Sequence, residues 1–215
     1  MRERSWYSRW HPLGMGESGV AILESAAWLA VSLPVVFFAA GLSMFVHDQR
    51  VLGIIPEAQL RESELPSLRW VPNGVGGSFG ISESDGREVI AHLADTAARE
   101  AQGVVVQTTK ISSRACYWVM RVDPDTGMAT GIEQEQCAST GAQALSKALD
   151  ATLLVIRKSH IGVRMEDTSG ARRFIDRALV FGLAIGGEFS LPAPGLEPER
   201  LQFSHIAFPR QEVTL

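Results

Sequence analysis

The sequence predicts an α+β protein in which a long N-terminal transmembrane α-helix is followed by a small globular domain with an antiparallel sheet and two helices. A long uncharged apolar run near the N-terminus predicts the first helix. Further along the chain, two segments carry apolar residues at helical spacing, and several β-branched runs are separated by turn residues.

Composition narrows the class of protein. The chain has 215 residues, of which 46% are apolar and 20% are charged, so a wholly disordered chain is excluded. The formal net charge is −4, whereas a nucleic-acid-binding protein normally carries a basic excess on one face. We therefore expect no nucleic-acid partner.

The apolar run extends over residues 20–46 and contains a single charge, Glu24. The 22 residues from Ser25 to Val46 would form a helix about 33 Å long at about 1.5 Å per residue, which is enough to cross a hydrocarbon core. Pro34 lies in the middle of the run, where a membrane helix tolerates proline with a kink.

Basic residues predict the orientation of this helix. Arg2, Arg4 and Arg9 precede it, whereas Arg50 and Arg61 are the first basic residues after it. Because cytoplasmic flanks carry more Lys and Arg, the N-terminus is expected in the cytoplasm and the bulk of the chain outside.

Three interpretations of the apolar run are open. A cleaved secretory signal usually has an apolar core of about 7–15 residues, and this run is longer. An uncleaved single-pass anchor fits its length and flanks. The third interpretation depends on how the run begins: Gly19 ends a polar, arginine-containing leader, four apolar or small residues follow, and then comes Glu24.

This Gly-x-x-x-x-Glu pattern resembles the processing site of type IV pilins, and in particular of the minor pilin-like (pseudopilin) proteins of tight-adherence (Tad) pili, of the TadE and TadF kind. The resemblance implies that a prepilin peptidase cuts between Gly19 and Val20. Glu24 would then be the fifth residue of the mature chain. Further implied partners are other pilin subunits, contacted through the N-terminal helix, and an inner-membrane assembly platform.

The role implied for Glu24 has a physical basis. A carboxylate in a membrane helix costs about 2.5–3.5 kcal/mol at the bilayer centre on insertion scales, so such a group normally has a partner. In a pilin-like assembly the partner is the N-terminal ammonium created by cleavage. A subunit out of register would leave both charges buried and unpaired, so the pair would determine register and recruitment.

The chain accordingly divides into four predicted parts. Residues 1–19 form a leader, residues 20–46 the transmembrane and assembly helix, residues 47–80 a stalk with a glycine-rich linker, and residues 81–215 an exported α+β domain. Prolines punctuate the stalk, and the glycine-rich stretch of residues 73–80 is interpreted as a flexible loop. That stretch lacks the Lys-Ser/Thr pair of a phosphate-binding loop.

Within the domain, local patterns predict the order of elements. A helix is expected from Ser84 or Asp85 to Gln102, because apolar residues recur at helical spacing. Two strands are expected at residues 104–111 and 115–122, with a turn at 123–127. Later elements are a helix opened by Thr140 and Gly141, a strand at 161–165, a central strand within 174–185 and an irregular tail from Leu191.

The two cysteines, Cys116 and Cys137, are an obvious disulfide pair if the domain is exported. The bond would close a loop of about 20 residues, which is worth about 3 kcal/mol in the loop-entropy model. Two buried free thiols are the alternative and fit a cytoplasmic domain.

No pattern predicts an enzyme. The five histidines are scattered (His11, His47, His92, His160 and His205), and no nucleophile, zinc-protease or similar motif is present. Glu133 and Glu135 are more simply solvent-exposed than a catalytic pair. We therefore expect no catalytic residues, no metal site and no cofactor.

The sequence thus predicts a minor pilin-like subunit that takes part in pilus assembly or surface adhesion. It would begin in a bacterial inner membrane, with its domain in the periplasm, and would then join a cell-surface pilus. The alternative is an uncleaved single-pass envelope protein that acts as a scaffold in a secretion or division complex.

Overall fold

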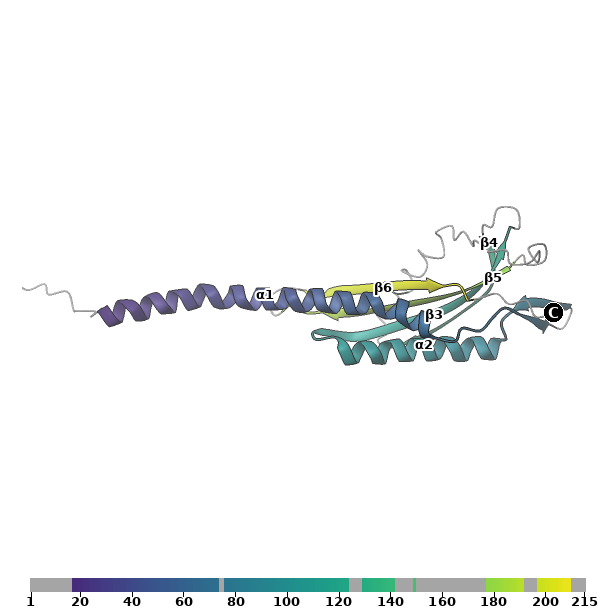
Figure 1. The fold of residues 1–215 in the computed structure, drawn as a ribbon, viewed down its shortest axis with the longest axis horizontal. Coiled ribbons are helices and arrows are strands. Elements are labelled where there is room, and N and C mark those ends of the chain that lie inside the picture. The colour runs from purple at the N-terminus through teal and green to yellow at the C-terminus, as the bar shows by residue number, and fades with distance from the viewer. Residues whose placement is uncertain are drawn as a thin grey trace, which may run out of the picture. The chain divides into compact units, whose positions relative to one another are not determined.

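The computed structural model describes residues 17–73, 76–123, 129–141, 149, 177–191 and 197–209 (Figure 1). It has the predicted α+β class: a long N-terminal helix, a four-stranded antiparallel sheet and a second helix. The chain divides into two compact units, Met1–Ser43 and Met44–Leu215, and each unit is described by itself below.

The first helix, α1, runs from Glu17 to Glu62. It contains a stretch that is long and apolar enough to cross a membrane, as the sequence predicted. The helix is uninterrupted at both Pro34 and Pro56. The expected kink at Pro34 stays a prediction.

Four antiparallel strands form the main sheet of the second unit. They are β3 (Thr108–Val122), β4 (Ala129–Thr140), β5 (Arg177–Phe189) and β6 (Glu199–Ala207), in the order β4-β3-β5-β6. β5 lies between β3 and β6, and its side chains are almost all buried. The central strand expected within residues 174–185 is therefore confirmed.

Two helices pack on one face of this sheet. They are α2 (Glu83–Val104) and the part of α1 that belongs to the second unit. Successive side chains of a strand point to opposite faces. One set of alternate residues of β3 and β5 packs against the two helices, and the other set forms a second cluster on the opposite face with Leu149. The first set is Ala115, Tyr117, Val119, Leu179, Phe181, Leu183 and Ile185, and the second includes Cys116, Trp118, Met120, Val180 and Ala184.

The contact between α2 and β3 depends on one glycine. A Cβ atom at Gly86 would lie 2.4 Å from Cε1 of the fully buried Tyr117, so the absence of a side chain there lets the ring lie against the helix. The Tyr117 hydroxyl accepts a hydrogen bond from Gln134 Nε2 and forms a second one with the side-chain amide of Gln136, both at 2.9 Å. Burial raises the pKa of this phenol.

Residues 47–62 differ from the stalk that the sequence predicted. They continue α1, and Leu52, Ile55 and Leu60 are buried in the core of the second unit. These residues carry an apolar stripe at helical spacing, which a helix buries on one side. Prolines therefore did not mark an irregular connector here.

The glycine-rich stretch also differs from its prediction. Instead of a flexible loop, β1 (Arg69–Asn73) and β2 (Gly76–Gly80) form a two-stranded antiparallel hairpin with Arg69 opposite Gly80. Ladder hydrogen bonds are made by the backbone, so a segment with few side chains can still pair.

Three further boundaries are corrected by the structure. The strands expected at 104–111 and 115–122 are one strand, β3, and Val104 is the last residue of α2. Thr140, expected to open a helix, ends β4. The tail expected to be irregular contains β6, which pairs with β5 along its whole length. Pairing with a distant strand decided these boundaries, and local propensity carries no information about that partner.

Other predictions fall outside the described residues. These are the leader up to residue 16, the turn at residues 124–127 and the strand at residues 161–165. The second domain helix is also outside, except for Leu149, which is helical and fully buried.

Candidate functional site

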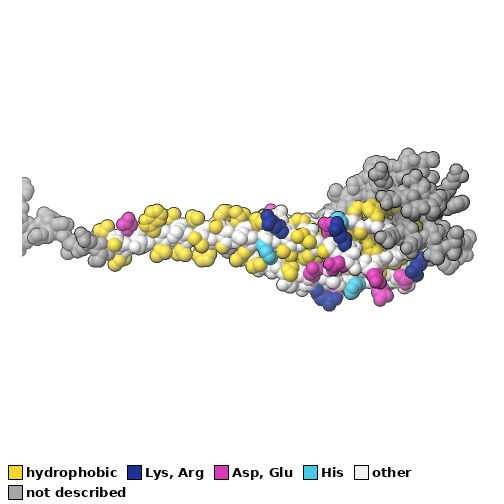
Figure 2. All heavy atoms as spheres, in the orientation of Figure 1, with side chains coloured by type: hydrophobic (Ala, Val, Ile, Leu, Met, Phe, Trp, Pro, Cys, Tyr) yellow, Lys and Arg dark blue, Asp and Glu magenta, His cyan; other side chains and the backbone are white. Residues whose placement is uncertain are grey.

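The N-terminal half of α1 is an apolar surface without a covering layer in the described structure. Large apolar side chains at consecutive positions are exposed, for example Val36, Phe37 and Phe38 at 60–63%. Figure 2 shows hydrophobic side chains gathered along this part of the helix. A helix that is apolar on all sides is stable only when lipid or other helices surround it, so this half of α1 is a candidate membrane and assembly surface.

The residues of the predicted processing site lie at the start of this helix. Gly19, Val20 and Glu24 are all within α1, which begins at Glu17. Gly19 and Glu24 are five residues apart, or about 7.5 Å along the axis. The bond between Gly19 and Val20 lies in the first turn, where backbone N–H groups have no partner within the helix and the turn frays readily.

A second acidic residue of α1, Asp48, has a very different setting. Its side chain is completely buried in the second unit. The carboxylate accepts hydrogen bonds from the backbone N–H groups of Val106 at 2.8 Å, Gln107 at 3.0 Å and Thr108 at 2.8 Å, and from the Thr108 hydroxyl at 2.7 Å. Asp48 thereby ties α1 to the segment that leads from α2 into β3.

The charge of Asp48 is maintained by these donors. Burial alone would raise its pKa, but the hydrogen bonds from Val106, Thr108 and Gln107, with a further contribution from His47, lower the pKa to about 2. The group is therefore ionised throughout the neutral range. A buried carboxylate that is satisfied by several N–H donors holds its surroundings in one arrangement.

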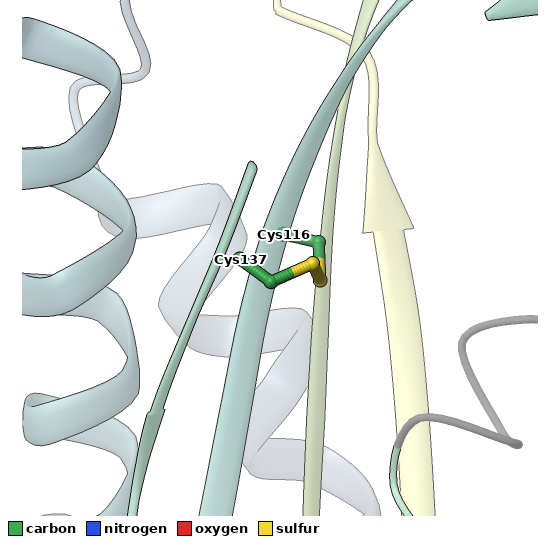
Figure 3. The surroundings of a disulfide bond; sticks show 2 residues. All are labelled: Cys116 and Cys137. Atoms are coloured by element: carbon green, nitrogen blue, oxygen red, sulfur yellow. A yellow bond between two sulfur atoms is a disulfide. The ribbon is translucent and has the colours of Figure 1, made fainter. Parts of the chain in front are cut away.

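The two cysteines come together as predicted. Cys116 of β3 and Cys137 of β4 are direct cross-strand partners, and their sulfur atoms lie at bonding distance, 2.00 Å (Figure 3). The pair lies on the sheet face that carries Trp118 and Met120. The bond links an inner strand to its neighbour and stabilises their pairing, by about 3 kcal/mol in the loop-entropy model.

Glu133 is exposed, as the sequence predicted, but its carboxylate is held by two arginines of the neighbouring strands. Its carboxylate accepts hydrogen bonds from Arg121 of β3, at 2.7 and 3.0 Å, and from Arg177 of β5. The Arg177 hydrogen bond is the main cause of its lowered pKa. A carboxylate held ionised between two guanidinium groups joins three neighbouring strands and is poorly suited to accept or release protons near neutral pH.

No group of three His, Cys, Asp or Glu side chains within the described ranges is arranged to hold a metal ion. Among the histidines there, His92 is exposed on α2, and Nδ1 of His47 lies 3.2 Å from Asp48. Comparison with protein-family models, with curated proteins and with solved structures finds no match to this chain.

Sequence reasoning missed Asp48. The signal that could have found it is helical phase: Met44, Asp48, Leu52 and Ile55 recur at steps of four, four and three, so they lie on one face of a continuing helix. Treating the first polar residues after the apolar run as the end of the helix concealed this pattern.

Proposed function

We propose that this chain is a minor pilin-like subunit of a Tad or type IV-type pilus, cut by a prepilin peptidase between Gly19 and Val20. The observation that carries the proposal is Glu24, which is the only charged residue of residues 20–46. It lies five residues after Gly19, at the start of a helix segment whose apolar side chains are exposed. In the proposal, residues 20–46 hold the subunit in the inner membrane before assembly.

The exposed half of α1 supports this function physically. Within the bilayer, lipid covers the apolar side chains; within a fibre, the corresponding helices of neighbouring subunits cover them. A new ammonium group at Val20 is the partner that the Glu24 carboxylate needs in an apolar bundle. Because an unpaired buried charge is strongly unfavourable, this pair selects one axial register between subunits.

The second unit supports a minor rather than a major subunit. It carries a four-stranded sheet, a helix and a cross-strand cysteine pair, which is much more than a bare assembly helix requires. The disulfide suits an oxidising compartment such as the periplasm or the cell surface. Priming of assembly or contact with a surface is the role proposed for this domain.

Processing is tested by intact mass and N-terminal sequencing of the protein from cells that contain the peptidase. We expect the mature chain to begin at Val20. Gly19→Leu should abolish the cut because the glycine is the residue before the scissile bond, and Gly16→Leu is the matched control that should leave it intact. Recovery of a wild-type chain that begins at Met1 would contradict the proposal and favour the uncleaved scaffold.

Assembly is tested at Glu24. Glu24→Ala should leave membrane insertion intact and prevent incorporation into fibres, since the charge pair is lost. Glu17→Ala removes an acidic residue of the leader and is expected to have no effect on incorporation. Normal incorporation of Glu24→Ala would remove the main support for the proposal.

A further inference from the structure

Two exposed apolar side chains lie where α2 ends and β3 begins. Val104 is 43% exposed and Val106 is 57% exposed, whereas Val105 between them packs against the core. Neither side chain is buried by the described part of the second unit. Figure 1 shows that this end of α2 and the start of β3 lie at the same end of the second unit.

The contacts of Asp48 determine the level of this segment along α1. The Asp48 carboxylate lies 2.8 Å from the backbone nitrogen atoms of both Val106 and Thr108. Val46, the last residue of the apolar run, precedes Asp48 by two residues, or about 3 Å of helix rise. All of these residues belong to the unit Met44–Leu215. Val106 therefore lies beside α1 at the level where the apolar run ends.

We propose that Val104 and Val106 form a second membrane contact, which enters the interfacial layer of the bilayer next to α1. The inference rests on the membrane anchoring in the proposed function but does not depend on cleavage at Gly19. When residues 20–46 span the bilayer, the level of Val46 is the boundary between acyl chains and headgroups. Apolar side chains held at that level gain by insertion into the boundary, as in peripheral amphipathic segments.

Charges near this segment favour an apolar contact rather than an electrostatic one. Lys110 is paired with Glu188, with 2.7 Å between Nζ and Oε2. The exposed residues Glu197, Glu199 and Arg200 lie at the start of β6, which pairs with the end of β5 opposite the start of β3. Arg50 is also exposed, two residues beyond Asp48 on α1. The two arginines are matched in number by Glu197 and Glu199, so these groups leave no basic excess for anionic lipid. The occupant we infer is therefore the surface of a zwitterionic bilayer, and the contact should be insensitive to salt.

The chain offers matched controls for this contact. Ile54 is 63% exposed but lies eight residues beyond Val46 on α1, or about 12 Å farther from the end of the apolar run. Phe208 is 44% exposed and follows the opposite end of β6. Both residues are apolar and about as exposed as the two valines. They differ from the valines mainly in their distance from the end of the apolar run.

The test uses the full chain in nanodiscs of phosphatidylcholine that contain nitroxide-labelled lipid. Single cysteines replace Val104, Val106, Ile54, Phe208 or Leu33, one at a time, and carry an environment-sensitive fluorophore. The native cysteines are paired with each other and leave the new thiol free to react. Labels at Val104 and Val106 should be quenched severalfold more by a nitroxide just below the headgroups than labels at Ile54 and Phe208, with no change on adding salt.

The outcomes separate this inference from the proposed function. Quenching at Leu33 by a deep nitroxide reports that the helix spans the bilayer. If Leu33 is quenched while Val104 and Val106 behave like Ile54 and Phe208, the second contact is refuted and the anchor stands. If Leu33 is not quenched, both are refuted. Shielding of Val106 that appears only in discs with several copies would refute the lipid contact and indicate a chain–chain interface.

Discussion

The two halves of α1 are one helix in two different environments. In the half before Met44, apolar residues point in every direction and stay exposed, as Leu29 does at 57%. In the half from Met44 to Glu62, one face is buried against the sheet, and Leu52 is fully enclosed. The same helical backbone is therefore exposed in its first half and part of the protein's own core in its second.

One carboxylate from each half, Glu24 and Asp48, shows the difference most clearly. Glu24 is exposed, and its carboxylate makes no hydrogen bond to a described residue. Asp48 is buried and accepts hydrogen bonds from three backbone N–H groups and one hydroxyl. A carboxylate satisfied within the chain stabilises the fold, whereas an exposed carboxylate such as Glu24 contributes little to it.

The largest expected effect is that of Asp48→Ala. Removal of the carboxylate leaves several buried donors without an acceptor, so the free energy of unfolding of the second unit should fall by about 3–5 kcal/mol. Denaturant unfolding of the detergent-solubilised chain measures this. Glu24→Ala is the matched variant in the other half and should change the unfolding free energy by less than about 0.5 kcal/mol. Equal losses in both variants would erase the distinction between the two halves.

Truncation of one leucine in each half of α1 compares the two environments without changing the charge of the chain. Leu52→Ala should lower the free energy of unfolding by about 2–5 kcal/mol, because it leaves a cavity in a packed core. Leu29→Ala removes the same atoms from an exposed position and should leave the stability of the second unit unchanged. Thermal and denaturant melts of the two variants in one detergent give the comparison, and a large loss in Leu29→Ala would show that the first half also packs on the domain.

Lowering the pH should reduce the free energy of unfolding of the second unit, because Asp48 loses its charge. The pKa of Asp48 is lowered from 3.8 to about 2, so the unfolded chain binds this proton more readily than the folded chain as the pH falls. The stabilisation, about 2.5 kcal/mol at about 1.4 kcal/mol per pKa unit, is complete above about pH 5 and is lost as the pH falls from about 5 to about 2.

The effect of pH is measured as the free energy of unfolding of the unchanged protein and of Asp48→Asn over a range of pH values. The variant lacks the titrating group, so the difference between the two curves should shrink towards low pH. Other carboxylates titrate equally in both proteins and cancel. A constant difference down to pH 2 would contradict the role assigned to the Asp48 charge.

The smallest expected effect concerns Gly53, within the buried half. A Cβ atom there would lie 3.4 Å from the Phe203 ring, an ordinary contact, and alanine is favoured over glycine inside a helix. Gly53→Ala should therefore raise the free energy of unfolding by about 0.5 kcal/mol. Hydrogen exchange of the amides around residue 53 would detect the gain, and a loss of protection would indicate that the helix and β6 pack more closely than the structure shows.

Much of the fold could be predicted because its signals are local. The stripe of Ile90, Leu93 and Ala97 predicted α2, and the β-branched and apolar runs predicted β5 and most of β3. The hairpin of β1 and β2 and the strand β6 could not be predicted, since their side chains carry no strong pattern. Their strands exist because a neighbouring backbone pairs with them.

The sequence alone determined the long apolar helix, the position of Glu24 within it and the possibility of a cysteine pair. Each of these depends only on residue type and spacing along the chain. The tertiary structure decided that α1 continues into the core, that Cys116 faces Cys137 across two strands and that Asp48 holds Val106. Asp48 and Val106 are 58 residues apart, so their contact forms only when the chain folds back. The pattern of neighbouring residues in the sequence therefore cannot predict it.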